Sequence, residues 1–415
     1  MVVRIAGKTT FTGKTYLKRP LLYTILSTQW NDSTDTYTTT SSGPLPNIHE
    51  KMRRCVLNAN GTVNYYLDDS DSTLKEDGTT PSVLDGTDGN VMVEIPKFWY
   101  RHTLSNNVNT WEIADGPVTG FTVHPAFIKA GVEVSHRYIG AYDACYLDAT
   151  DSTYKSGLNL DDMTSNLDLG ADKLASVSGV YPLVGVTRAE SRTLATNNGV
   201  GWHQLDFALY SAIQMLFIVE YGTFNTQAIL GAGNTGASYI STTANQTDSP
   251  HSIAGKSNAL GNGSTDTTSG ASSATRDTAY MSYRGIENWY GNCWTFADGI
   301  NINEGSAGNV HLTNDYTDFA DGTTTNYTLI SSSFPTASGY IRNILNTGAY
   351  FLSSTNSGGS SSTFITDFHY ANTFASRFVI VGGGANLGVV AGGFCLALVY
   401  GGGRANRVVG ARLCW

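Results

Sequence analysis

Alternating side chains near the C-terminus constrain the fold of this chain more than any other feature of its sequence. Between residues 394 and 400 every second side chain is bulky, and this period predicts a β-strand because successive strand residues point to opposite faces. A second strand is predicted after the glycine turn at residues 401–403. The side chains expected to face a core are Phe394, Leu396, Leu398, Val409, Ala411 and Leu413, and those expected to face outward are Cys395, Ala397, Val399, Val408, Gly410 and Arg412.

The outward face and the connecting loops carry chemically mixed side chains, which indicates a recognition surface on a fixed scaffold. The loop residues concerned are Gly384, Asn386, Leu387, Val390, Tyr400, Arg404, Asn406 and Arg407. Residues 371–415 contain four arginines and no acidic residue, although the formal net charge of the chain is -9. An ordinary C-terminal hairpin with surface arginines is the alternative interpretation.

Length and composition favour a large β-rich protein. A chain of 415 residues is expected to form two domains, or one domain with large insertions. Charged residues make up only 14% of it, whereas Gly occurs 45 times and Ser, Thr and Asn fill the regions between apolar runs, as is typical of extracellular or virion proteins. Nucleic acid is not an expected partner, because the chain is acidic and no run of Lys and Arg could neutralise phosphates.

The sequence predicts neither a secretory signal nor a membrane span. Its first residues lack a continuous apolar stretch, and the most apolar run, near residues 205–219, is interrupted by Asp206 and Gln214. The five cysteines are scattered, so neither a disulfide framework nor a zinc site is predicted. A bridge between Cys395 and Cys414 on neighbouring strands is left open, because strand pairing sets the sulfur separation narrowly.

The chain divides into three predicted parts. Residues 1–50 are polar and are expected to be an arm or linker, residues 51–131 a β-rich module, and residues 132–415 the main domain. In the module, Asn60 and Gly61 predict a hairpin because this dipeptide accepts positive φ. Residues 91–102 predict a strand with an edge or bulge at Pro96.

Two helices are predicted in the main domain. Thr187 and Glu190 form a capping box at the start of the first. Apolar side chains at helical spacing over residues 209–217 predict an amphipathic second helix that ends near Gly222. Polar surface insertions are expected at about residues 232–278 and 305–370, with a hairpin turn between them at residues 298–299.

Enzyme-like strings do not complete any known site. The phosphate-loop-like start at residues 7–15 lacks the first glycine, the GxGxxG string at residues 231–236 is not followed by a helical pattern, and the zincin-like string at His49 lacks its second histidine. Cys293 with a distant His203 or His369 has no evident orienting group, so a buried structural cysteine is favoured. We therefore expect no catalytic residues and no enzymatic activity.

Two binding constellations have simpler alternatives. The aromatic side chains of Trp202, Trp289, Trp294 and Phe296 could stack on sugars, but core packing is favoured. Oxygen-bearing side chains at Asp298, Asn301, Asn303 and Glu304 have the spacing of a calcium site, although a turn explains the first of them. No other cofactor or metal is predicted.

Three strings carry a family resemblance, YRGIENWYGNCWTFADG, GGGANLGVVAGGF and RVVGARL. The order of a strand, two helices, an aromatic hairpin, polar insertions and a terminal hairpin resembles the C-type lectin fold. The strings resemble its formylglycine-generating-enzyme-like branch, as found in phage tail-tip proteins and in variable proteins of diversity-generating retroelements. The implied fold class is α+β, a C-type lectin domain of two helices, a mixed sheet and long insertions, preceded by a β-rich N-terminal module.

The resemblance implies a function for the C-terminal face. Positions that vary in the family correspond to Gly384, Asn386, Leu387, Val390, Ala397, Val399, Tyr400, Arg404, Asn406, Arg407 and Val408. One departure is Ala385, where the family pattern usually has Trp. The implied protein is a virion tail-tip, cell-surface or extracellular adhesin that binds a host-surface protein or glycan beside other tail proteins, as a homotrimer in related phage proteins. A purely structural virion protein without a diversified site is the alternative.

Overall fold

The computed structural model describes residues 23–42, 48–156, 167–236, 251–268, 279–302, 308–371, 377–399, 401, 403 and 405–415. Residues 25–42, which we expected in an arm or linker, form a hairpin within a five-stranded antiparallel sheet. Alternate side chains of the first strand are buried, among them Leu26, Thr28 and Trp30. The sheet has the order β2-β1-β7-β6-β8, with β1 at Ile25–Asn31, β2 at Thr36–Ser42, β6 at Trp99–Ser105, β7 at Val108–Ala114 and β8 at Thr122–Val123.

A six-stranded sheet joins the predicted N-terminal module to the predicted main domain. The hairpin expected at Asn60 and Gly61 is confirmed, since β3 pairs with β4 around them. The strand expected over residues 91–102 is two strands that belong to different sheets, because the first ends at Pro96. The order is β15-β28-β11-β5-β3-β4, with β3 at Arg53–Leu57, β4 at Val63–Tyr66, β5 at Asn90–Pro96, β11 at His136–Gly140, β15 at His203–Gln204 and β28 at Leu413–Cys414. Residues 51–131 and 132–415 therefore share one sheet.

Several small sheets and short helical turns complete the fold. The three-stranded sheet consists of β12 at Cys145–Asp148, β13 at Thr153–Lys155 and β14 at Lys173–Ala175. Two-stranded pairs are β9 at Ile128–Lys129 with β10 at Val132–Glu133, β16 at Ser282–Tyr283 with β17 at Ile286–Glu287, and β22 at Asn343–Ile344 with β23 at Ser353–Thr355. Short 3-10 turns are η1 at His49–Lys51, η2 at Pro125–Phe127, η4 at Asn258–Leu260, η5 at Tyr316–Asp318 and η6 at Gly388–Val390.

Both predicted helices are present. The capping box is confirmed at the start of α2 (Arg188–Thr196), where Thr187 and Glu190 satisfy each other's backbone amides. Helix α3 (Phe207–Tyr221) begins at the N-cap Asp206 and ends at Gly222, whose φ of 63° suits glycine. The expectation of an amphipathic α3 is wrong, because every side chain from Phe207 to Val219 is buried. A short helix, α4, follows at Thr226–Leu230.

The C-terminal half is built on an eight-stranded sheet. Its path is β20-β19-β18-β25-β26-β24-β21, and β27 pairs with β18 in parallel. The hairpin turn predicted at residues 298–299 is wrong, since both residues lie inside β18, where the pairing with β25 shifts register. The strands are β18 at Trp294–Ile302, β19 at Val310–Leu312, β20 at Thr328–Ser331, β21 at Gly339–Tyr340, β24 at Phe368–Ala371, β25 at Arg377–Val381, β26 at Leu396–Leu398 and β27 at Val409–Gly410.

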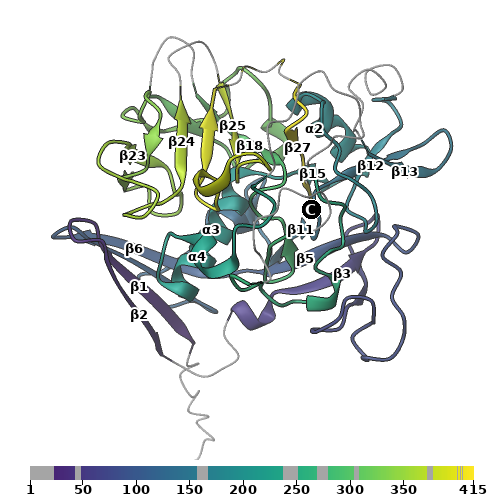
Figure 1. The fold of residues 1–415 in the computed structure, drawn as a ribbon, viewed down its shortest axis with the longest axis horizontal. Coiled ribbons are helices and arrows are strands. Elements are labelled where there is room, and N and C mark those ends of the chain that lie inside the picture. Colours follow the sequence, from purple (N-terminus) through teal and green to yellow (C-terminus); the bar gives the residue numbers. More distant parts are fainter. Residues whose placement is uncertain are drawn as a thin grey trace, which may run out of the picture.

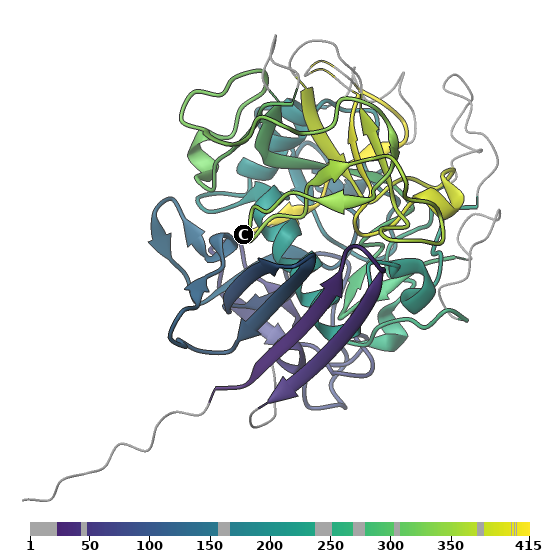
Figure 2. The ribbon, with the colours of Figure 1, turned by 90° about the vertical axis from the view of Figure 1, so that its left-hand side faces the viewer.

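Helix α3 lies at the centre of the fold, between the five-stranded and eight-stranded sheets (Figure 1). Its side chains from Phe207 to Val219 are buried on every face because sheets and loops surround it. A second apolar cluster lies on the other face of β26 and includes Trp294, Phe296 and Ile380. Figure 2 shows the yellow C-terminal segment in the half of the molecule away from the purple β1–β2 hairpin.

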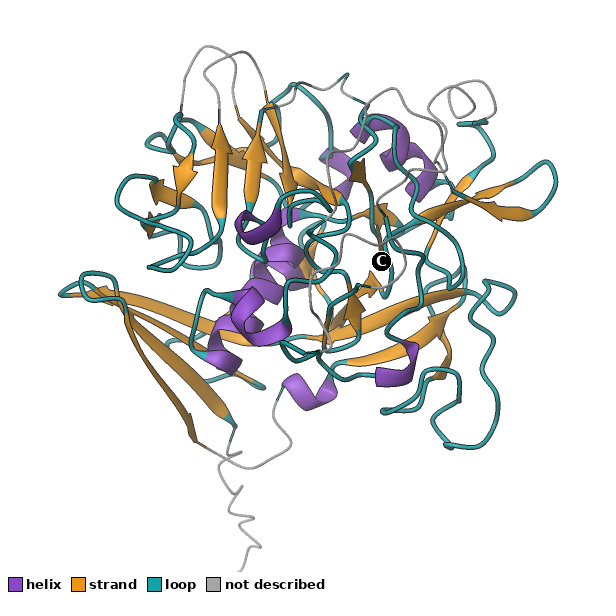
Figure 3. Ribbon diagram, in the orientation of Figure 1, coloured by secondary structure: helices purple, strands orange, loops and turns teal. Residues whose placement is uncertain are grey.

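The predicted α+β C-type lectin fold is wrong. Strands account for 34% of the structure and helices for 13%, and three α-helices occur in the described ranges, so the fold is β-rich with several sheets (Figure 3). Residues 305–370, expected as a polar insertion with short β-like pieces, contribute strands β19 to β24, and β19, β20, β21 and β24 belong to the eight-stranded sheet. Strand pairing satisfies backbone groups whether or not the side chains are apolar.

The insertion expected at residues 232–278 is also partly buried. Within its described part, the side chains of His251, Ser252, Ser257 and Thr265 are at most 4% exposed. They are buried because they bond to the core, as Ser257 does to the carboxylate of Glu287. No helix in the described ranges has both the length and the apolar composition of a membrane-spanning helix.

Candidate functional site

The predicted recognition residues lie in two loops, between β25 and β26 and between β26 and β27, except for Ala397, which lies in β26. Tyr400 and Arg404 lie outside the described residues. Gly384, Ala397 and Arg407 are buried, so the expected outward placement of these three is wrong. The remaining predicted residues and the neighbouring Val389 form what we call the C-terminal rim, which consists of Asn386, Leu387, Val389, Val390, Val399, Asn406 and Val408, all exposed or half-buried.

The alternation predicted along β26 is confirmed, but its second face is not free. Leu396 and Leu398 pack in the core around α3, as expected. Cys395 and Ala397 belong to the second apolar cluster and are 1% and 2% exposed. The second face is covered by side chains from segments distant in sequence, which periodicity cannot reveal. The predicted terminal hairpin is also wrong, because β27 pairs with β18 rather than with β26.

The backbone of residues 292–294 and the side chain of His251 bring the loops of the rim together. The carbonyl oxygen of Asn292 accepts a hydrogen bond from the backbone N–H of Ala385 at 3.0 Å. The same oxygen lies 2.9 Å from Nδ1 of His251, whose Nε2 lies 2.8 Å from the carbonyl oxygen of Arg407. The backbone N–H of Trp294 donates to the carbonyl oxygen of Val408 at 2.9 Å. The rim therefore rests on the segment of residues 292–294 and on His251.

The rim is mainly apolar. Leu387, Val399 and Val408 pack partly against the second cluster, and Val389 is 62% exposed. A Cβ added at Gly384 would lie 3.2 Å from the Trp294 ring, so this position tolerates little enlargement. The exposed polar groups of the described rim are amides, which donate and accept hydrogen bonds without charge. Apolar side chains beside amides suit a binding surface.

A buried ion pair, Arg412 with Asp143, holds Asn292, which bonds to a loop of the rim. The Arg412 guanidinium, predicted to face outward, is 2% exposed and donates to Asp143 at 2.7 Å. It also donates to the carbonyl oxygens of Gly140, Glu287 and Asn288. The other carboxylate oxygen of Asp143 accepts from the side-chain amide of Asn292 at 2.7 Å. Burial raises the pKa of Asp143 to about 6, against the opposing effect of Arg412.

A second buried carboxylate supports the other loop. Asp367 is 1% exposed and accepts a hydrogen bond from the backbone N–H of Phe394 at 2.7 Å. No ion-pair partner of this carboxylate occurs in the described part of the chain. A Cβ added at Gly392 would lie 2.2 Å from its oxygens. Burial raises the pKa of Asp367 to about 8, so the neutral acid predominates at pH 7.

Cys293 lies beside a histidine that sequence reasoning missed. Its Sγ lies 3.2 Å from Nδ1 of His251, which comes from the segment expected to be a surface insertion. His203 instead contacts Arg137, and His369 packs against Phe334. Burial raises the pKa of the Cys293 thiol well above its usual value, so the thiol stays protonated. A structural role is the better interpretation of this pair.

The other sequence candidates are part of the core or of ion-pair networks. Trp202, Trp289, Trp294 and Phe296 are at most 6% exposed, so they cannot form an open stacking surface. Asp298 binds Arg192 through both carboxylate oxygens, at 2.6 and 2.8 Å, and Asn301 binds Arg188 at 2.9 Å. Asn303 and Glu304 lie outside the described residues. Within the described ranges no group of three or more His, Cys, Asp or Glu side chains could hold a metal ion.

The remaining sequence candidates are the cysteine bridge and the phosphate-loop-like string. Cys395 and Cys414 are both buried and both have free thiols. The phosphate-loop-like string at residues 7–15 lies outside the described residues.

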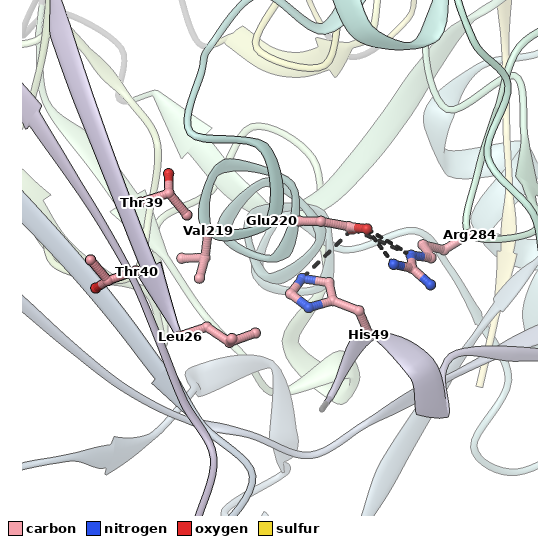
Figure 4. Close-up of a pocket in the computed structure, with 7 residues that line it drawn as sticks. All are labelled: Leu26, Thr39, Thr40, His49, Val219, Glu220 and Arg284. Atoms are coloured by element: carbon pink, nitrogen blue, oxygen red, sulfur yellow. Dashed lines mark hydrogen bonds and ion pairs between the residues drawn. The ribbon is translucent and has the colours of Figure 1, made fainter. Parts of the chain in front are cut away.

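A separate pocket lies at the C-terminal end of α3 (Figure 4). Its volume is about 290 Å³, and its polar side chains include His49, Glu220 and Arg284. Nε of Arg284 lies 3.0 and 3.3 Å from the two carboxylate oxygens of Glu220. Nε2 of His49 lies 2.8 Å from the carbonyl oxygen of Leu216 and 3.8 Å from the Glu220 carboxylate. Sequence reasoning missed this site, because its residues come from segments distant along the chain; His49 and Leu216, for example, are 167 positions apart.

Comparison with known proteins finds no family model that matches the chain and no curated protein that matches its sequence.

Proposed function

We propose that this chain is a binding protein of a virion tail and that the C-terminal rim recognises a molecule on the host surface. The observation that carries this proposal is the meeting of two loops, separated by β26, on the shared support of Asn292 and His251. Loops held on a rigid scaffold are the usual place for recognition residues. Removal of the apolar rim surface from water would supply affinity, and hydrogen bonds of the amides would orient the partner.

The target that this chemistry favours is a host-surface protein or a glycan. The described rim carries no carboxylate, so it would not repel the acidic surfaces common on cells. Residues 377–415 contain no Asp or Glu at all. Assembly as a homotrimer beside other tail proteins would multiply weak single contacts. Sedimentation velocity measures that assembly directly.

Replacement of the most exposed rim residues tests the proposal. Asn386→Ala combined with Val389→Ser should abolish binding to intact host cells or to their extracted surface material, while the melting curve by circular dichroism stays unchanged. The matched control is Val132→Ser, at a residue of β10 that is 65% exposed. Unchanged binding by the rim variant, with parental protein that does bind, would remove the rim from the site. Absence of any cell binding by the parental protein would favour a structural tail component.

Diversification of the rim is a separate part of the proposal. It requires a near-copy of the coding segment for residues 382–413, differing at adenines, beside a reverse transcriptase gene in the flanking DNA. Sequencing of that DNA tests this part alone. Absence of both would remove diversification and leave host binding to be judged by the cell experiment.

A further inference from the structure

Strand β2 (Thr36–Ser42) leaves a long strand edge unpaired. It is the last strand of the five-stranded sheet and pairs along all seven residues with β1, on one side only. In an antiparallel pair every second residue of an outer strand directs its N–H and C=O away from the partner, and no described residue bonds to these groups of β2. Figure 1 places β2 at the outer border of the molecule, and Figure 2 shows the hairpin from that side. This edge is therefore open to a further strand.

The β2 edge lacks the features that normally prevent strand pairing. Proteins protect sheet edges with short strands, charged side chains, prolines or bulges. Every other strand at the end of a sheet in the described ranges has at most four residues. β2 has seven residues, of the sequence TYTTTSS, without charge, proline or glycine, and its register with β1 is unbroken. Threonine and tyrosine also favour strands, so β2 suits pairing with another chain.

The side chains of β2 reach solvent on both faces of the sheet. Thr38, Thr39 and Thr40 are all exposed, and strand alternation places Thr39 on one face and the other two on the opposite face. Across the β1–β2 pair, the hydroxyl oxygens of Thr28 and Thr39 lie 3.1 Å apart, within hydrogen-bonding distance. Cross-strand contacts between threonines stabilise sheets. The outer edge of β2 offers threonines for the same contact.

The chemistry of β2 suits a second copy of the same strand. Two identical strands that meet edge to edge bring like charges close together whenever the strand is charged, and such pairs are destabilising. β2 carries no charge, so its pairing with itself meets no such repulsion. An antiparallel alignment centred on Thr39 would pair all seven residues and set Thr38 opposite Thr40 of the second copy.

We propose that two copies of this chain associate through antiparallel pairing of β2 with β2, with Thr39 at the two-fold axis. The pairing would add at least about six backbone hydrogen bonds, because every second residue exchanges two with its counterpart. The β2 edge is distinct from the C-terminal rim, so this inference goes beyond the proposed function and does not depend on it. A single chain would form a dimer, and a homotrimer would form a hexamer with three such two-fold contacts.

Charges placed on the edge test the pairing. In Thr38→Lys combined with Thr40→Lys, like charges would face each other across the two-fold axis. Sedimentation velocity of the full chain at high micromolar concentration should give this variant half the mass of the parental protein. Its melting curve by circular dichroism should stay unchanged, because both residues are exposed. Equal masses of the parent and the folded variant would refute the proposal. A monomeric parent would also refute it and would leave the edge to a strand of another protein.

A variant of opposite charge distinguishes direct pairing from an indirect effect. Thr38→Glu combined with Thr40→Glu should also have half the parental mass when it is alone. An equimolar mixture of the lysine and glutamate variants should regain the parental mass, because opposite charges then face each other. Failure of the mixture to associate would contradict direct pairing of the two strands.

A cysteine at the axis tests the register and serves also if the lysine variant does not fold. Thr39→Cys should form a disulfide between two copies on mild oxidation, since residues opposite each other in an antiparallel pair lie within disulfide range. The five native cysteines are buried, so they do not compete. Thr328→Cys, at an exposed residue of β20 at the end of another sheet, is the matched control and should stay unlinked. Equal cross-linking of the two variants would refute the register centred on Thr39.

Discussion

The two buried carboxylates under the C-terminal segment are held by different chemistry. Asp143 has a cation, Arg412, and an amide, Asn292, as partners. Asp367 has the backbone N–H of Phe394 and lacks an ion-pair partner within the described ranges. The residues around Arg412 therefore depend on a charged partner that is distant in sequence. The residues around Phe394 depend on the protonated carboxyl group of Asp367 and on Gly392, which leaves room for that group. Burial of a charge and burial of a neutral acid make opposite demands on their surroundings.

The largest expected effect on folding stability comes from removal of the Arg412 guanidinium. Arg412→Ala should lower the free energy of unfolding by about 3–5 kcal/mol, because Asp143 would stay buried without its charged partner. Urea denaturation measures the loss. Glu76→Ala is the control, since Glu76 is 65% exposed in its ion pair and its loss should cost less than about 1 kcal/mol. Equal losses in the two variants would contradict a special role for the buried pair.

The second expected effect is a dependence of folding stability on pH that comes from Asp367. The usual pKa of an aspartate is 3.8, whereas burial raises that of Asp367 to about 8 in the folded protein. Between these values the unfolded chain releases the proton and the folded chain keeps it, so stability falls as pH rises. The contribution is at most about 1.4 kcal/mol per pH unit and ends above the folded pKa.

Asp367→Asn isolates this dependence, because Asn stays neutral at every pH. Denaturation of parent and variant at about pH 5 and about pH 7 should show the parent losing stability relative to the variant. The difference between the proteins matters rather than either profile, since buried histidines such as His124 and His203 titrate in both. A pH-independent difference would mean that Asp367 titrates near its usual value.

A third effect concerns the space that Gly392 leaves. Gly392→Ala should cost about 1–3 kcal/mol, because its Cβ would lie 2.2 Å from the Asp367 carboxyl oxygens. Gly403→Ala is the matched control, since no atom of the described residues lies within 4 Å of a Cβ at that position. Thermal denaturation compares the two. Similar melting temperatures would show that the loop at Gly392 can move away from Asp367.

The smallest effect is expected on the rim itself. Val389→Ser should change the free energy of unfolding by less than about 0.5 kcal/mol, because the side chain is 62% exposed and fills no core space. Chemical denaturation of Val389→Ser and Arg412→Ala side by side compares an exposed rim residue with the buried ion pair beneath the rim. A loss near that of Arg412→Ala would mean that Val389 is part of the core.

Local signals in the sequence predicted local structure well. The capping box at Thr187, the turn at Asn60 and Gly61, and the alternation along β26 all depend on neighbours a few residues away, and all three are present. The inward placement of Leu396 and Leu398 followed from that alternation.

Contacts between distant residues could not be predicted in this way. Arg412 pairs with Asp143, which is 269 positions earlier, and His251 reaches Cys293 from a stretch that reads as a polar insertion. A surface arginine and a buried arginine look alike in one sequence, because only the position of the partner distinguishes them. The same limit hid the pocket of His49 and Glu220, and it led us to expect solvent on the second face of β26.

The place of β28 in the six-stranded sheet has a consequence for synthesis. Residues 413–414 lie between β11 and β15, and β15 pairs with no other strand in the described ranges. While the ribosome is still making residues before 413, one edge of β11 is unpaired and β15 has no neighbour. Such open strand edges invite pairing with other nascent chains. Completion of this sheet must therefore follow translation of residue 414 and its exit from the ribosomal tunnel, so truncation before residue 413 would favour aggregation.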